Sequence, residues 1–117
     1  MNREFAAFLF FRQIFLEEMM NLSQFREKID TIDIQILALL NRRAEIAKQI
    51  GSIKATSGLP IVDEIREEAI LRTIARDNPG DLGDAAAVRI YRQILNESRQ
   101  VQLDDAAAIR RNGETVR

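Results

Sequence analysis

The chain has 117 residues, of which 46% are hydrophobic and 30% charged, with 17 Lys and Arg against 18 Asp and Glu. This length predicts one domain that is large enough to bury a core, and a net charge of −1 disfavours a nucleic-acid partner. The sequence contains neither Cys nor His. Disulfides, thiolate catalysis and the most common general base and metal ligand are therefore excluded.

Residues 1–21 form an apolar N-terminal extension, and five of the six Phe residues lie within its first 15 positions. The helical spacing of Phe5, Phe8 and Phe15 predicts an extra apolar helix or a helix extension. A membrane-associated or disordered leader, or a true start at Met19 or Met20, stays open. No apolar run approaches the roughly 20 residues of a membrane span, so we expect a cytoplasmic protein without a membrane partner.

A long helix is expected over residues 23–56, because no Gly or Pro occurs before residue 51. Apolar residues recur every three or four positions and form a seam on one face of this helix. Asn21 or Ser23 can cap the start of the helix, and Gly58 and Pro60 follow its end. The seam consists of Phe25, Ile29, Ile32, Ile36, Leu39, Arg43, Ile46, Ile50 and Ile53.

Two shorter helices should follow, the first from Asp63 to about Asp77 and the second from about Asp84 to Leu103. The turn between them contains Pro79, and residues 104–117 form a polar tail that prolongs the last helix by a few turns. Nothing alternates with period two, so the fold class is all-α. A helix over residues 23–56 would be roughly 50 Å long, which predicts a homodimer whose long helices cover each other.

Arg43 lies in the apolar seam, where an arginine needs a carboxylate partner, a route to solvent or a bound ligand. Lys54 is 11 residues further along, about 16 Å on a helix axis, so both side chains could contact one small molecule. Arg26 lies 17 residues before Arg43, or roughly 25 Å. If Arg26 belongs to the same site, it must come from an antiparallel partner chain.

The second and third helices carry further polar residues on their inner faces. Asp63, Arg66 and Glu67 share one face of the second helix and either solvate its first turn or line a site. Ser98 and Gln102 continue the inward stripe of the third helix and need polar partners if buried. The combined excess of cations favours a small dianion, whose carboxylates arginine binds with two hydrogen bonds. Such a site can catalyse by restraint and charge stabilisation alone.

Residues 22–102 resemble the all-helical, AroQ-type chorismate mutases. Four groups of residues carry the resemblance: Phe25-Arg26-Glu27-Lys28-Ile29-Asp30, Arg42-Arg43 with Ile50-Gly51 and Lys54, Gly58-Leu59-Pro60-Ile61-Val62-Asp63 with Arg66-Glu67-Glu68, and Ser98 with Gln102. The domain is accordingly expected over residues 22–103. The resemblance implies an intertwined homodimer with two shared sites, and the rearrangement of chorismate to prephenate in phenylalanine and tyrosine biosynthesis. It implies no cofactor and no metal.

The resemblance also assigns roles to individual residues. Arg26 of the partner chain and Arg43 would hold the substrate carboxylates, with help from Ser98. Lys54 and Gln102 would donate to the ether oxygen. The ring end of the pocket would be formed by Asp63 through its backbone, by Arg66 and by Glu67, which would accept from the ring hydroxyl.

Two other functions remain open. An isochorismate–pyruvate lyase shares the helical scaffold, and a non-catalytic helical dimer could regulate a partner enzyme. The complete set of mutase residues favours the rearrangement of chorismate over both alternatives. The remainder of the chain is too short for a dehydratase, dehydrogenase or synthase domain, so we expect a protein that acts alone.

Overall fold

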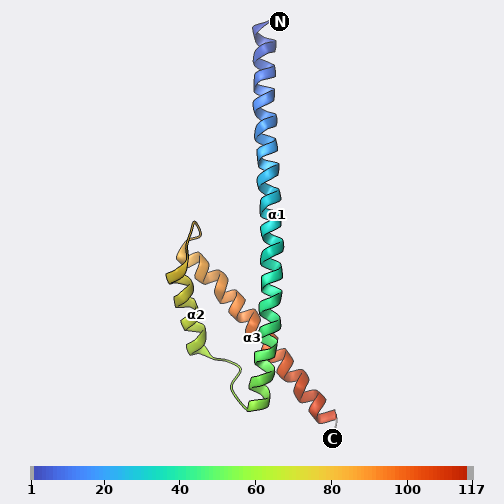
Figure 1. Ribbon diagram of the computed structural model, residues 1–117, viewed down its shortest axis with the longest axis vertical. Coiled ribbons are helices and arrows are strands. Elements are labelled where there is room, and N and C mark those ends of the chain that lie inside the picture. The colour runs from blue at the N-terminus through green and yellow to red at the C-terminus, as the bar shows by residue number, and fades with distance from the viewer. Residues whose placement is uncertain (1, 116–117) are drawn as a thin grey trace. The chain divides into compact units, whose positions relative to one another are not determined.

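The structure is a computed structural model that describes residues 2–115. It contains three helices, α1 (Arg3–Ser57), α2 (Glu64–Asp77) and α3 (Asp84–Thr115), and the described residues include no strand (Figure 1). The predicted all-α class, with one long helix and two shorter ones, is confirmed. Contacts divide the chain into two units, Met1–Leu39 and Leu40–Arg117, and α1 contributes residues to both.

The first unit is the N-terminal part of α1. The Asn2 side chain caps its start, because Oδ1 accepts hydrogen bonds from the backbone N–H of Glu4 at 2.7 Å and of Phe5 at 3.2 Å. The prediction that Asn21 or Ser23 caps the long helix is wrong: no Gly or Pro interrupts the leader, so the helix continues through both residues. The apolar leader is therefore a helix extension.

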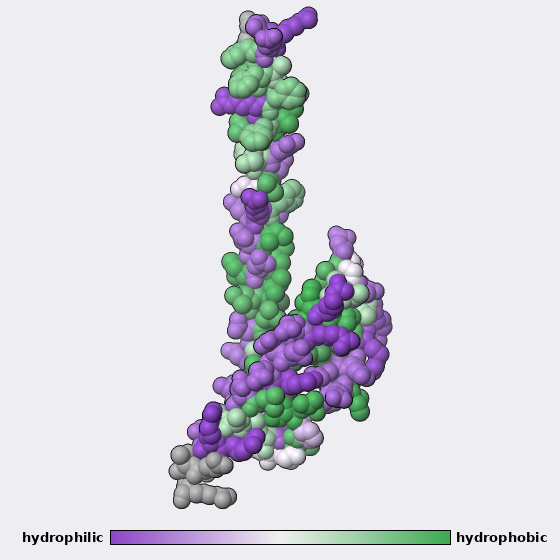
Figure 2. Space-filling model, turned by 180° about the vertical axis from the view of Figure 1, so that it is seen from behind, coloured by the Kyte–Doolittle hydropathy of each residue, from purple (hydrophilic) through white to green (hydrophobic). Residues whose placement is uncertain are grey.

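No residue between positions 2 and 39 is buried. Hydrophobic side chains lie along the surface of this segment (Figure 2), and Phe11 and Ile34 are 68% and 70% exposed. The part of the apolar seam from Phe25 to Leu39 is exposed as well. The first unit thus has no core of its own.

The second unit begins with the last turns of α1, which ends in a glycine turn. Gly58 has a φ of 69°, in the left-handed region that glycine enters at little cost. The N–H of Leu59 then donates back to the carbonyl oxygen of Lys54 at 2.9 Å, as is common at helix ends. This turn reverses the chain so that α2 can start at Glu64, with Asp63 as its N-cap as predicted.

The α2–α3 turn is held by Asn78, whose side-chain amide donates to the carbonyl oxygen of Leu82 and to Asp84 Oδ1. Helix α3 then runs to Thr115, past Leu103, so the predicted prolongation of the last helix into the polar tail is confirmed. The Ala-rich stretch after Asp105 favours helix, and Gly113 does not interrupt it. The extension also packs: Ser52 Oγ donates to Asp105 Oδ2 at 2.6 Å, and Ala106 is 6% exposed.

The core of the second unit consists of small side chains and one leucine, namely Ala47, Ala87, Leu95 and Ala106. Small residues allow close helix approach, and α3 crosses α1 next to Gly51 (Figure 1). A Cβ at Gly51 would lie 3.0 Å from the Cα of Gln102. The absence of that side chain therefore lets the backbone of α3 lie against α1 at this point. No helix within residues 2–115 has the length and apolarity to cross a membrane.

Candidate active site

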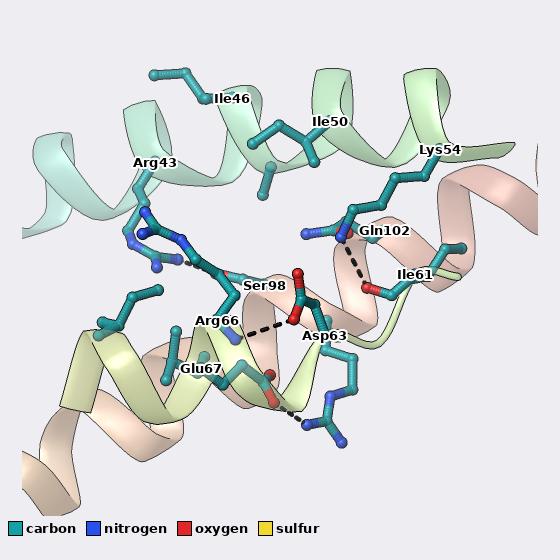
Figure 3. Close-up of a pocket in the computed structure, with 14 residues that line it drawn as sticks. Arg43, Ile46, Ile50, Lys54, Ile61, Asp63, Arg66, Glu67, Ser98 and Gln102 are labelled. Atoms are coloured by element: carbon teal, nitrogen blue, oxygen red, sulfur yellow. Dashed lines mark hydrogen bonds and ion pairs between the residues drawn. The ribbon is translucent and has the colours of Figure 1, made fainter. Parts of the chain in front are cut away.

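A pocket of about 430 Å³ lies in the second unit, between the last turns of α1, the start of α2 and the middle of α3 (Figure 3). This volume suits a small-molecule ligand. The apolar part of the wall comes from all three helices and from the loop before α2: Ile46, Ala47, Ile50, Ile61, Ile70 and Leu95. Because the rest of the wall is apolar, the polar lining residues determine which ligands the pocket can bind.

Seven of the eight predicted site residues line this pocket: Arg43, Lys54, Asp63, Arg66, Glu67, Ser98 and Gln102. They come from positions up to 59 residues apart in the chain. The fold thus brings candidate residues from three separate helical segments into one pocket. Arg26, the eighth, is exposed and belongs to the first unit. It is not among the lining residues.

Arg43 is held by Ser98. The Ser98 hydroxyl donates to the carbonyl oxygen of Ile94 at 2.9 Å, a common use of serine within a helix. Because its single proton is used there, the hydroxyl oxygen can accept from Nη1 of Arg43. The partner of this half-buried arginine is thus a hydroxyl rather than a carboxylate, and the positive charge of Arg43 is not neutralised by an ion pair.

Lys54 and Gln102 lie together at the other end of the pocket (Figure 3). Nζ of Lys54 donates to the carbonyl oxygen of Ile61 at 3.0 Å, which leaves two of the three ammonium protons for a ligand. The Oε1 atom of Gln102 is buried and has no hydrogen-bond partner. An unpaired buried acceptor is costly, and Oε1 lacks a hydrogen-bond donor, which a hydroxyl or N–H of a ligand could supply.

The first turn of α2 contributes three residues. Asp63 caps the helix, since its Oδ1 accepts from the N–H of Arg66 at 3.0 Å. Asp63 therefore has the capping role considered from the sequence, and it also lines the pocket. The Arg66 side chain extends from this turn toward Arg43 (Figure 3). Glu67 is bound by an arginine of α3, Arg99, at 2.5 Å.

Arg99 is a pocket residue that the sequence analysis did not identify. It directly follows Ser98 and precedes Gln102 by three positions, so it lies close to the same helix face. That spacing was the available signal. Its contact with Glu67, 32 residues away in sequence, depends on the packing of α2 against α3.

The pocket has an excess of positive charge. Four cations, Arg43, Lys54, Arg66 and Arg99, line it with only two carboxylates, Asp63 and Glu67. Within the described part of the chain, only Arg99 among these cations forms an ion pair. The remaining three favour a ligand with more than one negative charge. No group of three or more Asp and Glu side chains in residues 2–115 could hold a metal ion.

Comparison with known proteins agrees with this arrangement. Residues 25–103 match the family described as chorismate mutase type II, which is more than half of the chain. The chain belongs to this family. The match contains all eight predicted site residues and leaves out the apolar leader and the end of α3.

Individual relatives show the same similarity. The bifunctional chorismate mutase/prephenate dehydratase of Aquifex aeolicus is 44% identical over 82 residues, 67% of this chain but 23% of that protein. The chorismate mutase of Methanocaldococcus jannaschii is 31% identical over 84 residues, 69% of this chain and 83% of that protein. A solved structure of a conserved hypothetical protein from Pyrococcus furiosus has a TM-score of 0.60 and 40% identity, covering 70% of this chain and 95% of that chain. The chain thus spans less than a quarter of the bifunctional relative and most of the other two.

Proposed function

We propose that this protein converts chorismate to prephenate. One observation carries the proposal: Arg43, Lys54 and Arg66 line one pocket without a carboxylate partner, in a chain of the chorismate mutase type II family. Chorismate is a dicarboxylate of a size that suits the pocket volume. Arginine and lysine side chains without a carboxylate partner favour the binding of such a dianion.

The proposed reaction is a Claisen rearrangement within one molecule. The ether C–O bond of chorismate breaks while a new C–C bond forms, and no group is transferred to or from the protein. The pocket lining is consistent with such a step, because the chain supplies neither a histidine base nor a thiol nucleophile. The enzyme would accelerate the step by holding the reactive conformer and by stabilising developing charge.

Lys54 and Gln102 would stabilise the charge that grows on the ether oxygen as the C–O bond breaks. The ammonium group has two protons to spare after its bond to Ile61, and Gln102 carries an amide at the same end of the pocket. Donors fixed in place before the reaction lower the barrier most, since they do not reorganise during it. Lys54 is fixed in this way by the carbonyl oxygen of Ile61.

Arg43, supported by Ser98, would bind one carboxylate, and Arg66 lies on the same side of the pocket. We propose that Arg26 of the partner subunit binds a carboxylate as well, in a homodimer with two shared sites. The exposed seam from Phe25 to Leu39 supports dimer formation, because apolar surface of this extent favours burial against another protein surface. Glu67 and the backbone of Asp63 would contact the ring end, with Glu67 accepting from the ring hydroxyl. The cytoplasmic location stays a prediction.

The experiment is an assay of the purified full chain with chorismate, following loss of chorismate absorbance and identifying prephenate as the product. Isochorismate is assayed in parallel under the same conditions. Faster turnover of chorismate to prephenate supports the proposal. Faster release of pyruvate from isochorismate would instead favour the lyase, and no turnover of either compound would favour a non-catalytic role.

A further inference from the structure

Arg99 and Glu67 form the one ion pair between residues that line the pocket. We propose that Arg99 is a positioning residue: it holds the Glu67 carboxylate in the orientation that accepts a hydrogen bond from the ring hydroxyl of the substrate. This inference rests on the proposed function. It concerns a residue for which neither the sequence pattern nor the family match assigned a role.

The geometry of the pair leaves Glu67 available to a ligand. Nη2 of Arg99 contacts Oε2 of Glu67 at 2.5 Å, and no other described residue donates a hydrogen bond to either carboxylate oxygen. The second oxygen, Oε1, can therefore accept from a substrate hydroxyl while Oε2 stays bound to Arg99. A carboxylate held through one oxygen also loses less rotamer freedom when the ligand arrives.

The surroundings of the pair differ from those of an ordinary surface ion pair. The side chains of Arg99 and Glu67 are 36% and 20% exposed, whereas those of Arg76 and Asp77 are 73% and 58% exposed. Charged pairs with less solvent around them are less screened and hold their geometry better. Arg99 and Glu67 are thus suited to fix an orientation, while Arg76 and Asp77 are not.

Arg99 keeps this position although its Nε atom is buried without a hydrogen-bond partner. An unpaired buried donor is unfavourable, so the guanidinium is not placed to satisfy its own hydrogen bonds fully. The interaction that the guanidinium does make is the contact with Glu67, in the first turn of α2. This arrangement fits a role exerted through Glu67.

The test is a double-mutant cycle in the full chain with the variants Arg99→Gln, Glu67→Gln and the double variant. Arg89→Gln is the matched control, since Arg89 is an exposed arginine of α3 outside the pocket. We expect Arg99→Gln to lower kcat/KM by about 10- to 100-fold, because misplacing a binding group by about 1 Å has effects of this size. KM should rise more than kcat falls, since the hydroxyl contact exists in both the bound substrate and the transition state.

In the Glu67→Gln background the same Arg99 substitution should have little further effect on kcat/KM. Arg99→Lys, which retains the charge but not the planar fork, should recover part of the loss. If Arg99 only links α2 to α3, the variants would lower the melting temperature equally while kcat/KM of the folded protein stayed at the wild-type value.

Wild-type kcat/KM in Arg99→Gln, or additive losses in the double variant, would overturn the inference while leaving the proposed function intact. An inactive wild-type chain would overturn both. If Arg99→Gln does not fold, the cycle is run with Arg99→Lys, and additivity with Glu67→Gln overturns the inference in the same way.

Discussion

Residues 2–39 and residues 40–115 are both helical and both carry apolar side chains, yet only the second segment has a core. All four buried hydrophobic residues lie after position 40, where turns at Gly58 and Asn78 bring three helical segments together. The first segment exposes its apolar seam and carries Arg26, the one predicted site residue outside the pocket. The pocket therefore forms because the chain reverses direction and packs three helical segments together. The first segment has no such packing, and its apolar side chains can be buried only against another protein surface.

Lys54→Ala should have the largest effect and tests whether the second unit carries the chemistry. Removing a donor to developing negative charge costs about 10²–10³ in rate, so we expect that loss in kcat with an unchanged fold. Lys48→Ala, an exposed lysine of α1 outside the pocket, is the control. Measuring kcat and circular dichroism for both variants decides the matter, and half of the activity surviving in Lys54→Ala would contradict the assignment.

Gln102→Glu tests the same end of the pocket through pH. A glutamine amide donates at any pH, whereas a glutamate donates only when protonated, so the wild-type rate should stay nearly flat between about pH 5 and 8. The variant should lose activity at neutral pH and regain it as the pH falls toward the ordinary glutamate pKa of about 4.3. The pH profile of kcat/KM is the measurement. A variant profile that matched the wild type would remove Gln102 from the ether-oxygen role.

Mixing two inactive variants tests whether the first unit completes a site on another copy. Arg26→Ala and Arg43→Ala homodimers should both be nearly inactive. Unfolded and refolded together, they should form mixed dimers with one doubly mutated site and one intact site, which restores about a quarter of wild-type activity. No recovery, with mixed dimers shown to be present, would mean that the two arginines do not serve one site across copies.

Gly51→Ala tests whether the close packing of α1 against α3 stabilises the second unit. A Cβ at Gly51 would meet the backbone of α3 at Gln102, and overpacking of this kind costs about 1–3 kcal/mol. We expect a lower free energy of unfolding and a lower kcat, because Gln102 is displaced. Gly113→Ala is the control: a Cβ there meets nothing within 4 Å, so the change should stabilise the helix. Denaturant melts of both variants check the prediction, and equal stability in both would contradict it.

Removing residues 1–20 should have the smallest effect on activity. Residues 2–20 contain no buried side chain, and the family match begins only at residue 25. We expect an unchanged kcat/KM, measured against the full chain, although stability can fall. A shortened protein that is folded and dimeric but no longer binds a transition-state analogue would show that the leader contributes to the site.

Much of this arrangement follows from local sequence. The absence of Gly and Pro before Gly51 indicates the long helix, Asp63 marks the start of α2, and the inward face of α3 is readable from Tyr91 to Gln102 because helical spacing is set within a few residues. The ends of the helices were less predictable. Asn21 and Ser23 are residue types that favour the N-cap position. An N-cap marks the start of a helix only where the preceding residues favour another conformation.

Helix packing decided what the spacing could not. Glu67 and Arg99 lie on different helices, and nothing in their own segments indicates that they meet. The same holds for Gly51 and Gln102, whose close approach depends on where α3 crosses α1. Periodicity specifies which side of a helix faces inward; which residue lies opposite is set by the crossing of helices that are distant in sequence, and that is a property of the folded chain.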